Sequence, residues 1–90
     1  MKFTFKATKP FWRKFDKLSR AQKEAAWEKW KIFKMDPFDP RLNTHPIEAL
    51  TARASVKIYS ATIEQDLKVL FRIDGSVLTS LMIGTHKIYR

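Results

Sequence analysis

The sequence contains no cysteine, only two glycines and no long apolar run. Without cysteine there is no disulfide framework and no thiolate metal site. With glycine only at Gly75 and Gly84, a phosphate-cradling glycine loop is excluded. No apolar run reaches the roughly 18 residues that a membrane-spanning helix needs, so we expect no membrane partner. The lack of cysteine is also typical of a reducing compartment, and we expect a cytoplasmic location.

Acidic residues are scarce, above all in the first third of the chain. The whole sequence has 18 Lys and Arg against 9 Asp and Glu, a formal net charge of +9. Residues 1–34 hold 11 basic and 3 acidic side chains, a difference of +8, whereas residues 35–90 hold 7 and 6, a difference of +1. A positive field of this strength favours a polyanionic partner such as nucleic acid or an acidic protein. The alternative is a basic surface that is merely solvated.

Chain length and hydrophobic periodicity together predict one small α+β domain covering residues 1–90. We expect two N-terminal helices packed on a mainly antiparallel twisted sheet, in the order β-α-α-β-β-β. The first helix should follow a cap at Thr8 or Lys9, and the second should begin at a capping box formed by Ser19 and Gln22. The expected strands are residues 2–6, 53–59, 67–73 and 77–83.

Polar and apolar side chains alternate along residues 53–59 and again along residues 67–73. Such alternation is typical of a strand with two different faces. We therefore expect one face of the sheet to pack on the helices and the other to present a cationic surface. That surface is predicted to carry Arg53, Lys57, Tyr59, Lys68 and Arg72. Asp74 and Gly75 are expected to form the two-residue turn of the last hairpin.

Aromatic residues recur at helical spacing in both predicted helices, which favours a core position over a stacking platform for bases. The predicted core is Phe11, Phe15, Leu18, Trp27, Trp30, Val56, Ile58, Val69, Phe71, Leu81 and Ile83. Residues 36–52 contain three prolines, and no regular element is expected there. Loops of this length in small domains are usually functional or mobile.

A few side chains could carry chemistry. They are His45 in the loop, Asp66 at the start of a strand, His86 after the last strand, and the cations of the sheet. This set suits RNA cleavage, in which a 2′-hydroxyl loses a proton and a 5′-oxygen gains one. Imidazole transfers protons near neutral pH, and lysine or arginine stabilises the crowded phosphorane. No metal or cofactor is needed. The alternative for His86 is a structural hydrogen bond.

Four short motifs follow one another in order: Leu42-Asn43-Thr44-His45-Pro46-Ile47, Ile58-Tyr59-Ser60, Asp66-Leu67-Lys68-Val69-Leu70-Phe71 and Ile83-Gly84-Thr85-His86. Together they resemble the RelE/ParE toxins of bacterial type II toxin–antitoxin modules, and above all the YafQ-like, histidine-containing branch. The resemblance covers essentially the whole chain. It implies a metal-independent endoribonuclease that cuts mRNA on the ribosome and inhibits translation, and it implies an acidic antitoxin partner.

The resemblance also implies roles for single residues. The family's loop histidine falls on His45, its strand-start acid on Asp66, its Gly-Thr-His histidine on His86 and its C-terminal aromatic on Tyr89. We expect His86 to be the general acid on the 5′-oxygen, His45 or Asp66 to be the base, and Tyr89 to stack on or orient a base. Residues expected to hold phosphate are Arg53, Lys57, Lys68 and Arg72.

Two other functions remain open at this stage. The first is a ParE-like inhibitor of DNA gyrase, which uses the same fold without a proton-transfer set. The second is an inactive homologue that acts as a binding module. It is supported by Thr62, which stands where the YafQ-like pattern often has another histidine. The presence of both His45 and His86 favours the ribonuclease. Ribosomal RNA is then expected to meet the basic helical half through Arg13, Lys17, Arg20, Lys23, Lys31 and Lys34.

Overall fold

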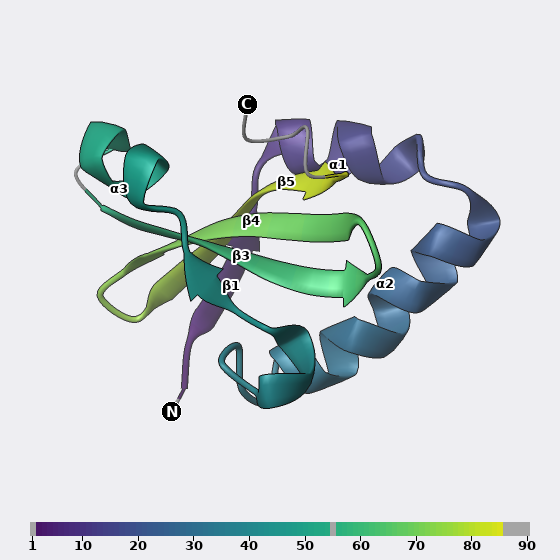
Figure 1. Cartoon of the computed structure of the whole chain (residues 1–90), viewed down its shortest axis with the longest axis horizontal. Coiled ribbons are helices and arrows are strands. Elements are labelled where there is room, and N and C mark those ends of the chain that lie inside the picture. Colours follow the sequence, from purple (N-terminus) through teal and green to yellow (C-terminus); the bar gives the residue numbers. More distant parts are fainter. Residues whose placement is uncertain (1, 55, 86–90) are drawn as a thin grey trace.

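The described part of the chain forms a five-stranded mixed sheet with helices on both sides (Figure 1). The computed structural model describes residues 2–54 and 56–85, with the backbone alone at residues 53 and 54. The strands are β1 (Thr4–Ala7), β2 (His45–Pro46), β3 (Lys57–Glu64), β4 (Leu67–Asp74) and β5 (Val77–Gly84), and their order in the sheet is β1-β5-β4-β3-β2. β1 runs parallel to β5, and the other neighbours are antiparallel.

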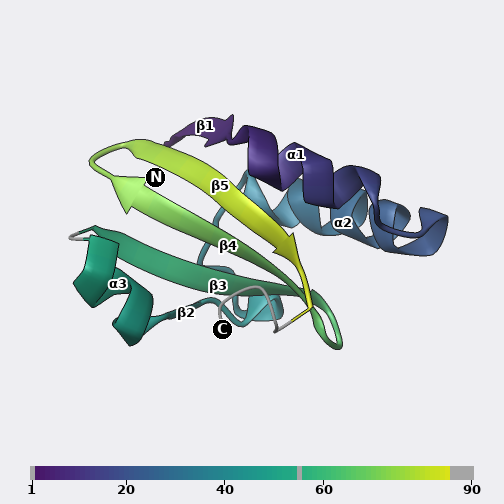
Figure 2. The same cartoon turned by 90° about the horizontal axis from the view of Figure 1, so that it is seen from above.

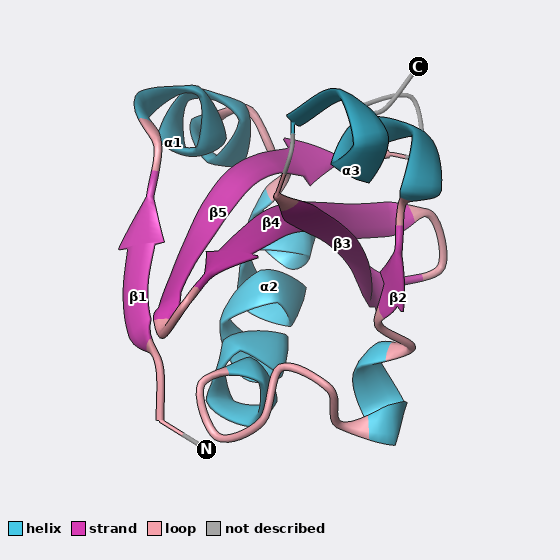
Figure 3. Cartoon of the chain, turned by 90° about the vertical axis from the view of Figure 1, so that its left-hand side faces the viewer, coloured by secondary structure: helices cyan, strands magenta, loops and turns pink. Residues whose placement is uncertain are grey.

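The helices divide between the two faces of the sheet. They are α1 (Lys9–Asp16), α2 (Arg20–Phe33) and α3 (Glu48–Ala54), and a 3₁₀ turn, η1 (Pro40–Leu42), precedes β2. α1 and α2 lie on one side of the sheet, whereas α3 lies on the other (Figures 2 and 3). α1 packs against β5, and α3 packs against β3. The prediction of two N-terminal helices on one face is confirmed, and α3 adds cover to the other face.

Local capping explains where the first two helices begin. Thr8 Oγ1 accepts a hydrogen bond from the Phe11 backbone N–H at 3.2 Å, and Pro10 lies in the first turn of α1. At the start of α2, Ser19 Oγ accepts from the Gln22 N–H at 3.1 Å while the Gln22 side chain accepts from the Ser19 N–H at 3.0 Å. Each contact satisfies a donor that the first helical turn leaves unpaired. Both predicted helix starts are therefore confirmed.

The segment 36–52 is more regular than predicted. Asp39 caps η1, since its carboxylate accepts from the Arg41 N–H at 2.9 Å, and Pro40 supplies a fixed φ in the first position. The backbone N–H of Ile47 then donates to the Ile58 carbonyl at 2.8 Å, which ties the start of α3 to β3. The contact between Ile47 and Ile58 joins residues eleven positions apart, and local propensity did not reveal it.

The strand predicted to begin at Arg53 begins instead at Lys57, because residues 48–54 form α3. Thr51 on α3 holds this arrangement, since its hydroxyl accepts from the Ile58 N–H at 2.9 Å. The predicted alternation of residues 53–59 therefore combined a helical turn with the start of a strand. That part of the prediction is wrong.

The last hairpin turns one residue later than predicted. Asp74 pairs with Val77, so the two central positions are Gly75 and Ser76. A positive φ of 62° falls on Gly75 and none falls on Ser76. This is the requirement of a turn with glycine at its first central position, as in type II′. A Cβ at Gly75 would meet no atom within 4 Å, so the backbone conformation, not a lack of space, favours glycine there.

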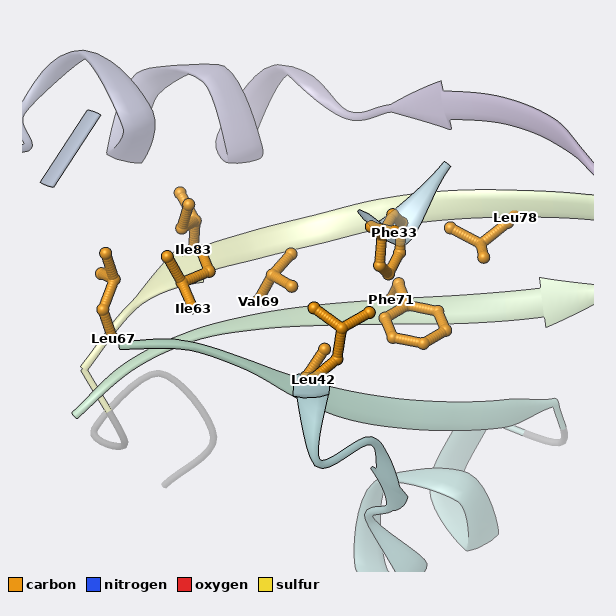
Figure 4. Packing of buried hydrophobic residues seen from close by; sticks show 9 residues of the cluster. Phe33, Leu42, Ile63, Leu67, Val69, Phe71, Leu78 and Ile83 are labelled. Carbon is orange, nitrogen blue, oxygen red and sulfur yellow. The ribbon is translucent and has the colours of Figure 1, made fainter. Parts of the chain in front are cut away.

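The main core lies between the sheet and the two N-terminal helices (Figure 4). Its buried residues are Phe33, Leu42, Ala61, Ile63, Leu67, Val69, Phe71, Leu78 and Ile83. The prediction that Ile58, Val69, Phe71 and Ile83 are buried is confirmed. Trp30 is half buried and packs edge-on against Phe5, with ring centroids 5.2 Å apart. Trp27 is 50% exposed, so its placement in the core was wrong.

Candidate functional site

The register of β3 and β4 decides which predicted site residues share a face. Directly opposite residues in an antiparallel pair project to the same side. Tyr59 lies opposite Phe71, and Lys57 lies opposite Ile73, which packs against the main core. Lys57 and Tyr59 therefore belong to the side of the sheet that α1 and α2 cover, which we call the helix-covered side. The prediction that they share a cationic face with Lys68 and Arg72 is wrong, because the alternation within each strand does not say how the two strands pair.

The other face of the sheet, which we call the α3 side, collects three of the predicted residues. Arg72 lies opposite Ile58, Lys68 lies opposite Thr62, and His45 lies opposite Ser60. His45 and Lys68 flank β3 on its two sides, about 10 Å apart across the sheet and about 7 Å along it by ordinary strand spacing. Long side chains from these positions can reach a single nucleotide.

His45 is exposed, and one of its ring nitrogens already has a partner. Its Nδ1 lies 3.1 Å from the backbone oxygen of Asn43. A carbonyl oxygen only accepts, so Nδ1 carries the hydrogen and Nε2 of the neutral ring keeps its lone pair. Asn43 adopts the left-handed conformation, with φ 48°, at the end of η1, and this turn directs its carbonyl toward the ring. The geometry leaves Nε2 able to accept a proton.

The loop that carries His45 is firmly anchored. Arg41 donates through Nε and Nη2 to the two carboxylate oxygens of Asp39, each at 2.9 Å. These hydrogen bonds lower the pKa of Asp39 to about 2. Thr44 Oγ1 donates to the Pro37 carbonyl, and Leu42 is buried in the main core. These hydrogen bonds and the burial of Leu42 fix the loop that carries His45, which suits a residue that must be held in position.

Lys68 is held as well. Its Nζ donates to Thr62 Oγ1 at 2.9 Å, and both side chains are half buried. Lys68 also lies opposite Gly84, the last residue of β5, so the chain leaves the sheet beside it. Asp66, two residues before Lys68, is exposed in the turn between β3 and β4. The sequence could not reveal the contact between Lys68 and Thr62, because it depends on the register.

Three predicted site residues cannot be placed. His86 and Tyr89 lie outside the described residues, and Arg53 belongs to α3 but has only its backbone described. Their roles stay predictions. In the sequence, His86 follows Gly84, the last residue of β5, by two positions.

The residues predicted to meet ribosomal RNA lie on α1, on α2 and at the ends of these helices. Arg13, Lys17, Arg20, Lys31 and Lys34 are exposed, and Lys23 is half buried. Arg20 pairs with Glu24 and Lys31 pairs with Glu28, each at 3.3 Å. Exposed pairs of this kind contribute little to folding stability. Both the paired and the unpaired cations therefore stay on the surface, where a polyanion can reach them.

A cavity of about 390 Å³ opens on the helix-covered side, between α1, α2 and the sheet. Most of its lining is apolar, and it includes Trp12 and Trp27, which are 44% and 50% exposed. Phe15 bridges them, with ring centroids 5.5 Å from Trp12 and 5.6 Å from Trp27. We call this the aromatic groove. The sequence does carry one signal for this groove. Adjacent residues of a helix project about 100° apart, so the neighbouring rings of Phe11 and Trp12 cannot both point straight into the core.

No protein-family model and no curated protein matches the sequence. Solved structures do match. RelE in the RelE–RelB complex of Pyrococcus horikoshii OT3 superposes with a TM-score of 0.72 at 17% identity, covering 94% of this chain and 96% of that one. The chain has the RelE/YafQ toxin fold. YafQ in the E. coli DinJ–YafQ complex gives a TM-score of 0.71 at 13% identity, covering 98% and 97% of the two chains.

A third structure with the RelE/YafQ fold is the metal-bound toxin from Helicobacter pylori, with a TM-score of 0.66 at 14% identity, covering 98% of this chain and 99% of that one. Within residues 2–54 and 56–85 of this chain, no group of three or more His, Cys, Asp or Glu could hold a metal ion. In the same residues no helix is long and apolar enough to cross a membrane.

Proposed function

We propose that this chain is the toxin of a type II toxin–antitoxin pair and a metal-independent endoribonuclease that cuts mRNA on the ribosome. The observation that carries the proposal is the α3 side of the sheet. There His45 on β2 and Lys68 on β4 lie on either side of β3, and this supports a shared role for the two residues. A proton acceptor and a held cation that can reach the same nucleotide are what cleavage by an internal 2′-hydroxyl requires.

The proposed reaction needs no group from outside the chain and the substrate. His45 Nε2 accepts the proton of the 2′-hydroxyl, whose oxygen forms a bond to phosphorus. The bond from phosphorus to the 5′-oxygen breaks, and His86 donates a proton to that oxygen. The products are a 2′,3′-cyclic phosphate and a 5′-hydroxyl. Lys68 and Arg72 stabilise the charge on the phosphorane, and Asp66 is the alternative base.

The ribosome fits the distribution of charge. The exposed cations of α1 and α2 belong to a segment with a difference of +8 between basic and acidic residues. Ribosomal RNA offers a dense array of phosphates to such a surface, and each neutralised phosphate releases counterions. A ribosomal partner would be met in the cytoplasm, so the proposal includes a cytoplasmic location.

The aromatic groove is the surface proposed for the antitoxin. We assign to it an acidic segment with bulky apolar side chains, because the lining is aromatic while Lys6 and Lys29 also line the groove and the surrounding helices are basic. The complexes RelE–RelB and DinJ–YafQ support a protein partner for this fold. Half-exposed tryptophans in a groove are typical anchors of such interfaces.

Replacing Trp27 by alanine is expected to weaken antitoxin binding about 30-fold or more, the scale of a hot-spot residue. Because Trp27 is 50% exposed, the free chain should keep most of its stability. Isothermal calorimetry with the purified antitoxin measures the affinity. Met35→Ala is the matched control, since Met35 is 75% exposed and does not line the groove. An unchanged affinity for Trp27→Ala would mean that the antitoxin binds elsewhere.

The activity itself is tested by adding the purified chain to translating ribosomes. We expect cuts within the mRNA, with 2′,3′-cyclic phosphate and 5′-hydroxyl ends, and little cutting of the same mRNA without ribosomes. A parallel supercoiling assay with DNA gyrase examines the ParE-like alternative. Inhibited gyrase with intact mRNA would establish that alternative. Neither effect, together with tight antitoxin binding, would identify an inactive homologue that serves as a binding module.

A further inference from the structure

The side chain of Thr62 accepts a hydrogen bond from the ammonium of Lys68. The Nζ to Oγ1 distance is 2.9 Å, and the two residues lie directly opposite each other in β3 and β4. Both are half buried on the α3 side. A lysine side chain has four rotatable bonds, so a contact at its far end restricts the position of the charge.

We propose that Thr62 is a positioning residue that holds the Lys68 ammonium in place for a phosphate oxygen. The inference rests on the proposed function, in which Lys68 stabilises the scissile phosphate. The ammonium has three N–H donors, so one bond to Thr62 leaves two for the substrate. Thr62 is also neutral, and unlike a carboxylate it does not cancel the charge that the phosphorane needs. A charge fixed before the substrate arrives need not reorganise in the transition state.

This role explains how a threonine at position 62 can serve cleavage although it cannot transfer a proton. In the resemblance to YafQ-like toxins Thr62 stands where a histidine is often found, and on the sequence alone this supports the alternative of an inactive homologue. The pairing with Lys68 gives position 62 another task, since the long Lys68 side chain reaches the Thr62 hydroxyl on the neighbouring strand. In this proposal Thr62 holds the Lys68 ammonium in place, and His45 or Asp66 accepts the proton of the 2′-hydroxyl.

Thr62→Val removes the acceptor and keeps the size and shape of the side chain. We expect the rate of cleavage of ribosome-bound mRNA to fall about tenfold, the scale of one lost hydrogen bond to a charged group. Thr62→Ser keeps the hydroxyl and should restore most of the rate. In a Lys68→Met background, Thr62→Val should have no further effect, because the two residues act as a unit. Thr4→Val, on exposed edge strand β1, is the matched control.

A second measurement does not depend on cleavage. In the parental chain the two Hε protons of Lys68 should give separate NMR signals, and these should merge in Thr62→Val. Added inorganic phosphate should shift the Lys68 signals at lower concentration in the parental chain than in Thr62→Val. If Thr62→Val leaves the Lys68 signals and the phosphate titration unchanged, the positioning role is overturned. If both change as expected while the parental chain leaves mRNA intact, the positioning role stands and the proposed function fails.

Discussion

Replacing His45 by glutamine is expected to lower the rate of mRNA cleavage by about 10²–10⁴-fold, the scale of general acid–base catalysis. The glutamine amide can still donate to the Asn43 carbonyl, which accepts from His45 at 3.1 Å, but it cannot take up a proton. His45 is exposed, so thermal unfolding should be nearly unchanged. Single-turnover cleavage of ribosome-bound mRNA measures the effect on the chemical step.

The matched variant is Asp66→Asn, because Asp66 is the alternative base. Asparagine keeps the shape of the side chain and removes its basicity. A large loss for His45→Gln with a small one for Asp66→Asn assigns the base to His45. The reverse pattern would assign it to Asp66 and leave His45 a structural part of the loop. The two variants therefore separate the alternatives that the sequence leaves open.

His86→Gln provides the corresponding test of the general acid. We expect a loss of the same order, about 10²–10⁴-fold, because the 5′-oxygen would leave without its proton. Substrates with a better leaving group at that position should be affected less. If His86→Gln folds normally and cuts at the parental rate, His86 is structural and its assignment as the acid fails.

Replacing Phe71 by alanine is expected to lower the free energy of unfolding by about 3–5 kcal/mol, the range for removing a buried aromatic ring. Phe71 is fully buried at the centre of the sheet. Its ring meets Phe33 edge-on at 5.0 Å and stacks on Tyr59 at 5.5 Å. Alanine would therefore leave a cavity between α2, β3 and β4. Chemical denaturation followed by tryptophan fluorescence measures the change.

Phe38→Ala is the control for that measurement. Phe38 belongs to the same series of rings, since it meets Tyr59 edge-on at 5.2 Å, but it is 42% exposed. Less apolar surface returns to water when it is truncated, so its cost should be well below that of Phe71→Ala. Equal costs for the two variants would show that burial at the centre of the sheet is not what makes Phe71 important.

Much of the fold follows from the sequence, because it depends on contacts between near neighbours. The caps at Thr8 and Ser19 use side chains three residues from the N–H groups that they accept from. The alternation of residues 67–73 predicts β4, and Gly75 predicts a tight turn close to its true place. Each of these features is decided within a few residues, so the amino-acid order alone states them.

The candidate site follows only in part. The sequence proposed the residue types His45, Lys68 and Arg72, and the structure places all three on the α3 side. It also proposed Lys57 and Tyr59, which the register of β3 and β4 moves to the helix-covered side. A shift of one residue in that register would exchange the two sets, and no local pattern states the register.

By itself, then, the sequence determined the first strand, the two N-terminal helices, the three long strands that end the described chain, the excess of positive charge in residues 1–34 and the candidate proton carriers. Only the tertiary structure decided that residues 48–54 form α3, that Trp27 lines a groove and that Thr62 holds Lys68. The physical reason is the range of the interactions. Caps and turns form between neighbours, whereas strand pairing and helix packing join segments far apart in the chain.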